Sequence, residues 1–121
     1  MGHMPDRIAS FCPRYHHAVE LVGRRWTGAI IRVLLNGRAR YHELHAAIPD
    51  ISDRMLSERL RELELEGVIE RVVVPETPVR VEYELTEKGR ALEPVVRAIA
   101  KWAERWVPAE AASAKRRAAG T

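Results

Sequence analysis

Residues 51–67 read ISDRMLSERLRELELEG and mark both ends of one helix. Ser52 is placed to cap the first turn, because a serine hydroxyl accepts a hydrogen bond from an otherwise unpaired amide. Asp53 follows where the helix dipole favours an anion. Gly67 suits the left-handed conformation that follows many helices. The segment therefore predicts a helix over Ser52–Glu66.

The two faces of this helix differ in character. Leu56, Leu60 and Leu63 share one face, which predicts packing against a core. The opposite face carries four polar residues, Arg54, Ser57, Glu58 and Arg61. A DNA-recognition helix needs this arrangement, since it packs by its back and offers arginines at its front. A solvated amphipathic helix has the same pattern, so the neighbouring segments must decide between the two interpretations.

Length and composition limit the class of protein. A chain of 121 residues with 46% hydrophobic residues favours one compact domain. The formal net charge of +3 permits a nucleic-acid partner without requiring one. A single cysteine excludes an internal disulfide framework and fits a reducing, cytoplasmic location. No apolar run reaches the roughly 18 residues of a membrane span, so we expect no membrane contact.

Short helices precede this segment. Hydrophobic spacing predicts three of them, at residues 15–22, 26–35 and 41–48. Pro49-Asp50 forms a turn, so the third helix and the Ser52 helix make a helix-turn-helix. Residues 38–41 suit a short edge strand. Trp26 is expected in the core, and Gly28 suits a close approach by another backbone.

Downstream of the Ser52 helix the hydrophobic period changes to two. Residues 68–74 are rich in valine, and residues 80–85 alternate cleanly, with their apolar side chains on one face: Val81, Tyr83 and Leu85. The loop between these segments contains two prolines, which stiffen it. A β-hairpin directly after a recognition-type helix is a wing.

A long final helix is predicted from Glu87, with Thr86 as its cap. Its apolar stripe is bulky for a peripheral helix of so small a domain: Leu92, Val95, Val96, Ile99, Trp102, Ala103 and Trp106. Pro108 should end or kink the helix. Because an exposed stripe of this size marks an interface, we expect a dimer interface on the first and last helices, formed by Ala18, Val19, Val22, Val95, Ile99, Trp102 and Trp106.

The order of three helices, recognition helix, hairpin and long helix defines a winged helix-turn-helix. We therefore predict an α+β fold, mainly α, with a long C-terminal dimerisation helix. Residues 5–107 form this domain. Residues 108–121 form an alanine-rich, basic tail or a second short helix. Residues 1–4 are interpreted as a cloning remnant that ends at the native start, Met4.

Five motifs lie between Cys12 and Gly89, and the resemblance that they carry covers roughly Cys12 to Trp106. They are Cys12-Pro13, Gly23-Arg24-Arg25-Trp26-Thr27, Tyr41-His42-Glu43-Leu44, the stretch from Ile51 to Leu63, and Val81-Glu82-Tyr83-Glu84-Leu85-Thr86-Glu87-Lys88-Gly89. Together they resemble the HxlR family of bacterial transcriptional regulators. The resemblance implies a homodimer that binds double-stranded DNA at an inverted-repeat operator. It also implies, as in some members, a sensor of oxidants or electrophiles at Cys12. Gly28 and Leu65 depart from the family pattern. Leu65 falls on the outward arc of its helix, so either it packs under the wing or the phase of the helix drifts there.

Candidates for DNA contact lie on three elements. The recognition helix supplies five of them: Ser52, Arg54, Ser57, Glu58 and Arg61. The helix before it begins with Arg40 and His42, and the wing carries Thr77 and Arg80. Arginine and serine donate to phosphates or base edges, whereas Glu58 either accepts from a cytosine amino group or orients the arginines. The alternative is that Glu58 forms helical ion pairs with Arg54 and Arg61; Arg59 is expected in a structural ion pair.

Cys12 is the candidate redox sensor. Arg14, His16 and His17 flank it, and positive neighbours favour the reactive thiolate form of a cysteine. With one cysteine per chain, a disulfide must cross a dimer or join a small thiol. The alternative is a packed, inert thiol.

The sequence offers no enzyme, cofactor or metal site. It lacks a phosphate-binding glycine loop, a nucleophile elbow and a thiol pair. The paired histidines, His16-His17 and His42 with His45, have no third ligand. Two other functions remain open: a winged helix that binds a protein partner, and a regulator that binds a small apolar effector between its dimerisation helices. Salt-sensitive binding would indicate DNA, and salt-independent binding a protein partner.

Overall fold

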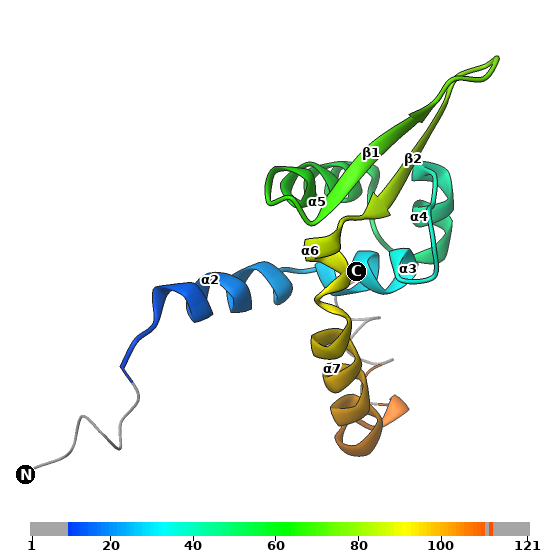
Figure 1. The fold of residues 1–121 in the computed structure, drawn as a ribbon. Helices are drawn as coiled ribbons and strands as arrows, with labels where there is room; N and C mark the ends of the chain where they lie inside the picture. The colour runs from blue at the N-terminus through cyan, green and yellow to red at the C-terminus, as the bar shows by residue number, and fades with distance from the viewer. Residues whose placement is uncertain (1–9, 111, 113–121) are drawn as a thin grey trace, which may run out of the picture.

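The structure is a computed structural model that describes residues 10–110 and residue 112, and its fold is the predicted winged helix-turn-helix (Figure 1). The elements in chain order are α2 (Pro13–Val22), α3 (Thr27–Leu34), α4 (Tyr41–Ala47), α5 (Asp53–Leu65), β1 (Ile69–Val74), β2 (Arg80–Leu85), α6 (Glu87–Arg90) and α7 (Glu93–Trp106). The two strands pair antiparallel, with Ile69 opposite Leu85 and Val74 opposite Arg80. The predictions for residues 1–9, 111 and 113–121 lie outside the described residues.

One apolar core joins α3, α4, α5 and the base of the hairpin. Helix α5 contributes Leu56, Leu60 and Leu63, each no more than 2% exposed. Helix α3 contributes Ile30 and Ile31, both at 0%. Burial of each such side chain contributes about 1.5–3 kcal/mol relative to exposure. The inward face predicted for the recognition helix is confirmed.

Both predicted ends of the recognition helix are confirmed. The Ser52 hydroxyl accepts a hydrogen bond from the Met55 amide at 3.0 Å, which satisfies a donor of the first turn. At the other end, Gly67 has a φ of 78°, in the left-handed region. The next amide, of Val68, donates to the Leu63 carbonyl at 2.9 Å and turns the chain into β1.

Helices α2 and α7 project from the body in different directions, away from the hairpin (Figure 1). Helix α2 has no buried residue. Helix α7 buries only Val96, which is 6% exposed. Both helices therefore expose apolar faces that the core of this chain does not cover.

The prediction of one long helix from Glu87 is wrong. Thr86 caps a short helix, α6, by accepting from the Gly89 amide at 3.1 Å, and a separate helix, α7, follows. Pro94 explains the break, because a proline inside a helix lacks the amide donor and clashes with the carbonyl four residues earlier, here that of Arg90. A proline is tolerated in the first turn of a new helix, where Pro94 stands. The break allows α7 to leave the body at its own angle.

Smaller differences concern element boundaries. Helix α2 begins at Pro13, before the predicted start at residue 15, because proline suits a first helical turn. Trp26 is not helical: its φ is 76°, and α3 begins at the next residue. The predicted edge strand is a single bridge, in which Ala39 and Tyr83 exchange hydrogen bonds of 3.0 and 2.8 Å.

Three further expectations have different outcomes. No second backbone approaches Gly28, where an added Cβ would meet no atom within 4 Å. Leu65 is 83% exposed and does not pack beneath the wing. Helix α7 ends at Trp106, ahead of Pro108 as predicted, and the Ala112 amide donates to the Pro108 carbonyl at 3.1 Å. A helical turn therefore follows Pro108.

Gly89 lies where a side chain does not fit. An added Cβ would collide with the Val68 carbonyl oxygen and lie 2.9 Å from Leu85 Cδ2. We therefore expect Gly89→Ala to lower the free energy of unfolding by about 1–3 kcal/mol, measured by urea denaturation. The control is Gly28→Ala, because alanine there meets no neighbour and favours the helix by about 1 kcal/mol. A Gly89→Ala protein as stable as the wild type would show that the contact relaxes without cost.

Candidate nucleic-acid interface

The outward face of α5 presents the predicted polar residues to solvent. Ser57 and Arg61 are exposed, and the Arg54 side chain is 89% exposed. Arg54 Nε lies 3.4 Å from Glu58 Oε2, which is the first of the two helical ion pairs given as the alternative interpretation. The alternative pair of Glu58 with Arg61 does not form. Two arginine side chains are thus available on a helix whose back is fixed to the core.

Arg59 anchors the flank of α5, as predicted. Its side chain is 12% exposed, and its guanidinium pairs with Glu62 at 3.2 Å. Its Nε also donates to the Arg25 carbonyl at 2.8 Å, while Arg24 lies 3.4 Å from Glu62. The Arg25 guanidinium lies 4.9 Å from the ring centre of Trp26, which is half-buried against the core. These contacts fix the recognition helix to the α2–α3 connection.

Tyr41 joins the two helices of the helix-turn-helix, a role not predicted from the sequence. Its hydroxyl donates to Asp53 Oδ1 at 2.9 Å and lies 3.4 Å from Ser57 Oγ. The His45 ring stacks on Tyr41, and its Nε2 lies 3.5 Å from the same Asp53 oxygen. The hydrogen bond with Ser57 lowers the pKa of Tyr41, but burial and the Asp53 carboxylate raise it by more, so the net pKa is raised. The available signal was an aromatic residue at the first position of α4.

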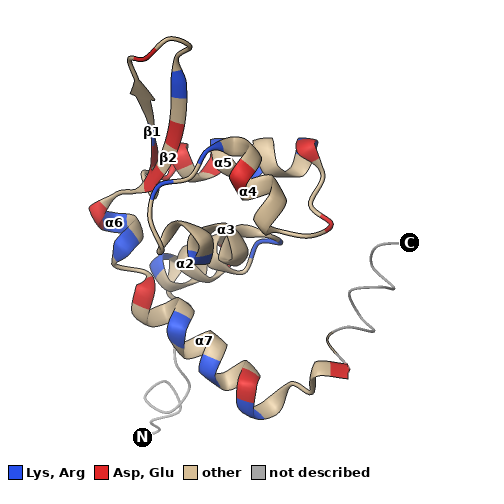
Figure 2. Cartoon of the chain, turned by 90° about the vertical axis from the view of Figure 1, so that its right-hand side faces the viewer, with Lys and Arg blue, Asp and Glu red and all other residues tan. Residues whose placement is uncertain are grey.

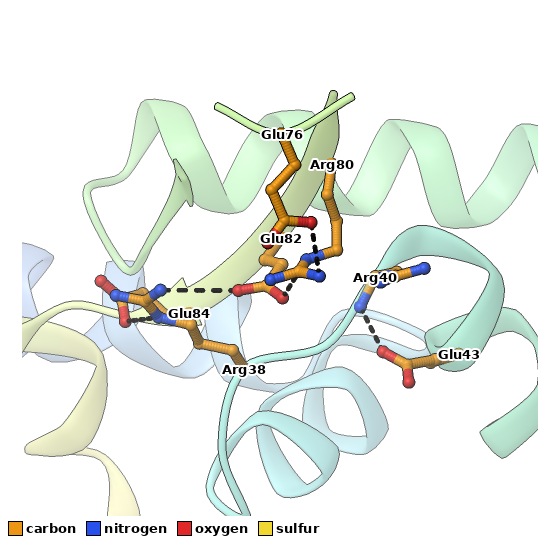
Figure 3. A network of polar contacts seen from close by, with 7 residues as sticks. All are labelled: Arg38, Arg40, Glu43, Glu76, Arg80, Glu82 and Glu84. Carbon is orange, nitrogen blue, oxygen red and sulfur yellow. Dashed lines mark hydrogen bonds and ion pairs between the residues drawn. The ribbon is translucent and has the colours of Figure 1, made fainter. Parts of the chain in front are cut away.

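A chain of ion pairs connects the wing to the segment before α4 (Figure 3). Arg80 Nη1 donates to Glu76 Oε1 at 3.0 Å, and Arg80 Nε lies 3.0 Å from Glu82 Oε2. Arg38 contacts Glu82 at 3.5 Å and Glu84 at 2.8 Å. The hydrogen bond with Glu84 raises the pKa of Arg38, and the same bond lowers the pKa of Glu84 against the opposing effect of burial. The predicted wing contact, Arg80, is therefore already paired with two carboxylates.

The glutamates of β2 are less exposed than their alternation with apolar residues suggested. The side chains of Glu82 and Glu84 are 17% and 20% exposed. Arg38 and Arg80 cover them, so both faces of this strand are occupied. No local pattern in the sequence indicates this arrangement, because Arg38 reaches the two glutamates only across the Ala39–Tyr83 bridge of the folded chain.

A hollow of about 490 Å³ lies between the wing and the start of α4. It brings together four residues predicted to contact DNA: Arg40, His42, Thr77 and Arg80. The Arg40 amide donates to Glu43 Oε1 at 2.7 Å, while its guanidinium points away from the ion pairs of the wing (Figure 3). Tyr41 also lines this hollow. The wing and the beginning of α5 therefore adjoin the same end of α4.

The hairpin is acidic. Residues 69–85 contain four glutamates and two arginines. Figure 2 shows acidic segments on both sides of the basic segment of β2. Attraction between this wing and a polyanion must therefore come from local placement of its arginines and not from its net charge.

An apolar groove of about 750 Å³ lies between α2 and α7. Its walls include five residues of the predicted dimer interface: Ala18, Val19, Val22, Val95 and Ile99. Trp102 and Trp106 continue the stripe along α7 and are 61% and 60% exposed. Gly28 also lines the groove. The structure thus gathers the two predicted interface helices around one apolar surface.

Cys12 is exposed and unpaired at the start of α2. Its neighbour Phe11 packs against the His16 ring, with 5.2 Å between ring centres. His17 turns toward α5, where its Nε2 lies 2.8 Å from Glu66 Oε2. In the single chain the thiol is therefore accessible, and the helix that carries it contacts the end of the recognition helix.

The fold and the polar outward face of α5 are those of a winged helix-turn-helix transcriptional regulator. The sequence model of the HxlR-like helix-turn-helix family matches residues 21–111. The chain therefore belongs to that family, and the resemblance of its motifs is confirmed. Within the part of the chain that the structure describes, no helix is long and apolar enough to cross a membrane.

Two similar proteins of Bacillus subtilis are HTH-type transcriptional regulators. The chain is 54% identical to the HTH-type regulator YvaP of Bacillus subtilis over 82% of its own length and 92% of the relative's. It is 48% identical to the B. subtilis regulator YodB, covering 80% of this chain and 87% of that one.

Solved structures of transcriptional regulators also match this chain. The reduced form of YodB matches with a TM-score of 0.74 at 48% identity, covering 81% of this chain and 96% of that one. Diamide-treated YodB matches with a TM-score of 0.71 at 47% identity, over 83% and 99% of the two chains. The redox regulator HypR in its oxidised form matches with a TM-score of 0.73 at 38% identity, over 78% and 96%.

Proposed function

We propose that this protein regulates transcription in the cytoplasm by binding an inverted-repeat operator in double-stranded DNA as a homodimer. The observation that carries the proposal is the orientation of α5. Leu56, Leu60 and Leu63 hold its back in the core, while Arg54 and Arg61 face solvent. A helix held in this way can enter a major groove without unfolding any part of the domain.

The polar face of α5 supplies the proposed contacts in the major groove. Arg54, Ser57 and Arg61 donate to base edges or phosphates, and Glu58 orients Arg54. Ser52 lies at the N-terminal end of the helix, which enters the groove first.

The second proposed set of contacts surrounds the hollow between the wing and α4. Arg40, His42, Thr77 and Arg80 line it and adjoin the beginning of α5. A duplex seated on α5 would therefore bring its flanking phosphates to this hollow. The roles of these residues are proposals that mutation can test one at a time.

The proposed dimer is built from α2 and α7. Val19 and Val95 are 47% and 44% exposed, and Trp102 is 61% exposed, although all three are apolar. A second copy of the chain can cover both helices at once, because a two-fold axis brings the same surface of each protomer together. Each dimer then presents two recognition helices to one side of a duplex.

Selection of bound sequences from a random duplex pool tests the DNA proposal. We expect enrichment of an inverted repeat whose half-sites lie about one helical turn, roughly 34 Å, apart. Affinity should fall steeply as salt rises, since phosphate contacts release counterions. Binding whose affinity does not change with salt would favour a protein partner. Enrichment of a sequence only in the presence of a small apolar molecule, bound in the α2–α7 groove, would favour an effector-dependent regulator.

The same regulator is proposed to respond to oxidants through Cys12. The thiol is exposed, and the matching structures include reduced and diamide-treated YodB and oxidised HypR. Two Cys12 thiols lose two electrons and two protons to diamide and form one disulfide across the dimer. One Cys12 thiol and one small thiol, oxidised together by the same reagent, form a mixed disulfide.

Treatment with diamide is expected to change DNA affinity by about 1–3 kcal/mol of coupling free energy. Non-reducing gels and mass spectrometry of the intact protein should show a cross-linked dimer or a thiol adduct at Cys12. Cys12→Ser should bind DNA like the reduced wild type and ignore diamide. A wild-type protein that forms neither product and binds DNA unchanged after treatment would show that Cys12 is inert.

A further inference from the structure

Arg80 is the most restrained arginine of the proposed DNA-binding face. Two carboxylates, Glu76 and Glu82, lie 3.0 Å from its guanidinium, and its side chain is 29% exposed. Arg54 of the recognition helix has one carboxylate neighbour at 3.4 Å and is 89% exposed. A DNA phosphate can approach Arg54 freely, but at Arg80 it must compete with the two carboxylates.

The two carboxylates that pair with Arg80 differ in their exposure and in their other contacts. Glu82 belongs to β2, is 17% exposed and also contacts Arg38 at 3.5 Å. Glu76 belongs to the loop between the strands and is 50% exposed, and its ion pair is with Arg80. Figure 3 shows Glu82 paired with both Arg80 and Arg38, whereas Glu76 is paired with Arg80. Displacement of Glu76 therefore breaks one ion pair of the network, and displacement of Glu82 would break two.

We propose that Glu76 masks Arg80: its carboxylate occupies the side of the guanidinium that a DNA phosphate takes, and the wing engages DNA when Glu76 is displaced. This inference rests on the proposed binding of DNA. Carboxylate and phosphate accept from a guanidinium in the same forked geometry, so one can replace the other. Glu82 keeps Arg80 directed at the hollow beside Arg40 and His42 while the exchange occurs.

The charges of the hairpin support an exchange of partners. Exposed ion pairs are weak, so a phosphate can outcompete Glu76. Until it does, the wing presents an excess of carboxylates, which repel DNA. A phosphate that binds Arg80 replaces the ion pair with Glu76. This contact therefore releases fewer counterions than a phosphate contact with an unpaired arginine would. Masking should thus weaken binding to any duplex, whatever its sequence.

Titration of a mixed-sequence duplex tests the proposal without knowledge of the operator. Glu76→Gln is expected to tighten binding about two- to fivefold, the range that breaking one exposed ion pair allows. The slope of log affinity against log salt should steepen by about 0.9 per engaged wing. Glu70→Gln is the matched control, because Glu70 lies on the same hairpin, loses the same charge and makes no ion pair with Arg80.

A double-mutant cycle with Arg80→Gln separates masking from a general effect of charge. If Glu76 masks Arg80, Glu76→Gln should raise the affinity for DNA more than Glu70→Gln does when Arg80 is present. In the Arg80→Gln background the two substitutions should raise the affinity equally. An equal gain with and without Arg80 would overturn the proposal, as would weaker binding of Glu76→Gln. Unchanged melting temperatures show that the hairpin is intact. Failure of the wild type itself to bind DNA would instead refute the proposed function.

Discussion

Replacement of Val95 and Trp102 by glutamate together is expected to give a folded monomer that binds its operator at least a hundredfold more weakly. Val95 and Trp102 are 44% and 61% exposed in the single chain, so the core does not depend on them. In a dimer they would be covered, and four buried charges would oppose assembly. A monomer also loses the gain of roughly 10²–10⁴ in affinity that linking two binding sites provides.

Light scattering checks that the variant is a monomer, circular dichroism checks that it is folded, and a DNA shift assay measures the loss of operator affinity. Lys101→Glu is the control, since it changes the net charge of the same helix by the same two units, at an exposed position outside the apolar stripe. A double variant that remains a stable dimer would place the interface elsewhere. A variant that precipitates should be replaced by Val95→Lys alone and measured again.

Loss of both Arg54 and Arg61 is expected to abolish operator recognition while the fold is preserved. Each arginine that reads a guanine contributes about 1–3 kcal/mol of discrimination, and a dimer loses each contact twice. An arginine that holds a phosphate instead weakens binding to all sequences and reduces the salt slope. Competition with operator and mixed-sequence duplexes distinguishes these cases for each single substitution to alanine.

The matched control for this pair is Arg97→Ala, an exposed arginine on α7, away from the recognition helix. Melting temperatures should be unchanged, because neither substituted side chain contributes to the core. Should the Arg54→Ala, Arg61→Ala protein keep both its operator affinity and its salt dependence, α5 is not the recognition helix. The protein-interaction alternative would then account better for the exposed Val73 and Val79 of the wing.

Local chemistry made the central part of the fold predictable. The Ser52 cap, the leucines of α5 and the left-handed Gly67 depend on neighbours a few residues apart. The turn and the change of hydrophobic period are similarly local, so the order of helix, turn, helix and hairpin follows from them. The outward placement of Arg54 and Arg61 needs only the inward placement of the leucines.

Contacts between distant segments were not predictable in the same way. Nothing near Glu82 in the sequence indicates that Arg38 covers it, because the two residues meet only when the hairpin folds back on the core. The bond from Tyr41 to Asp53 depends on the angle between two helices. The break before α7 had a local cause in Pro94, and the regular apolar spacing on both sides of it obscured that cause.

Helix α2 has ten residues, none of which is fully buried within its own chain, although Leu21 near its C-terminal end packs against the core. A helix of that length is marginal in water without packing. We expect α2 to complete its folding only when a second protomer covers it, so assembly and local folding form one equilibrium. Dilute chains would expose this segment to proteases, whereas paired chains would hide it. The lifetime of the protein would then rise with its own concentration, and unpaired copies would be removed first.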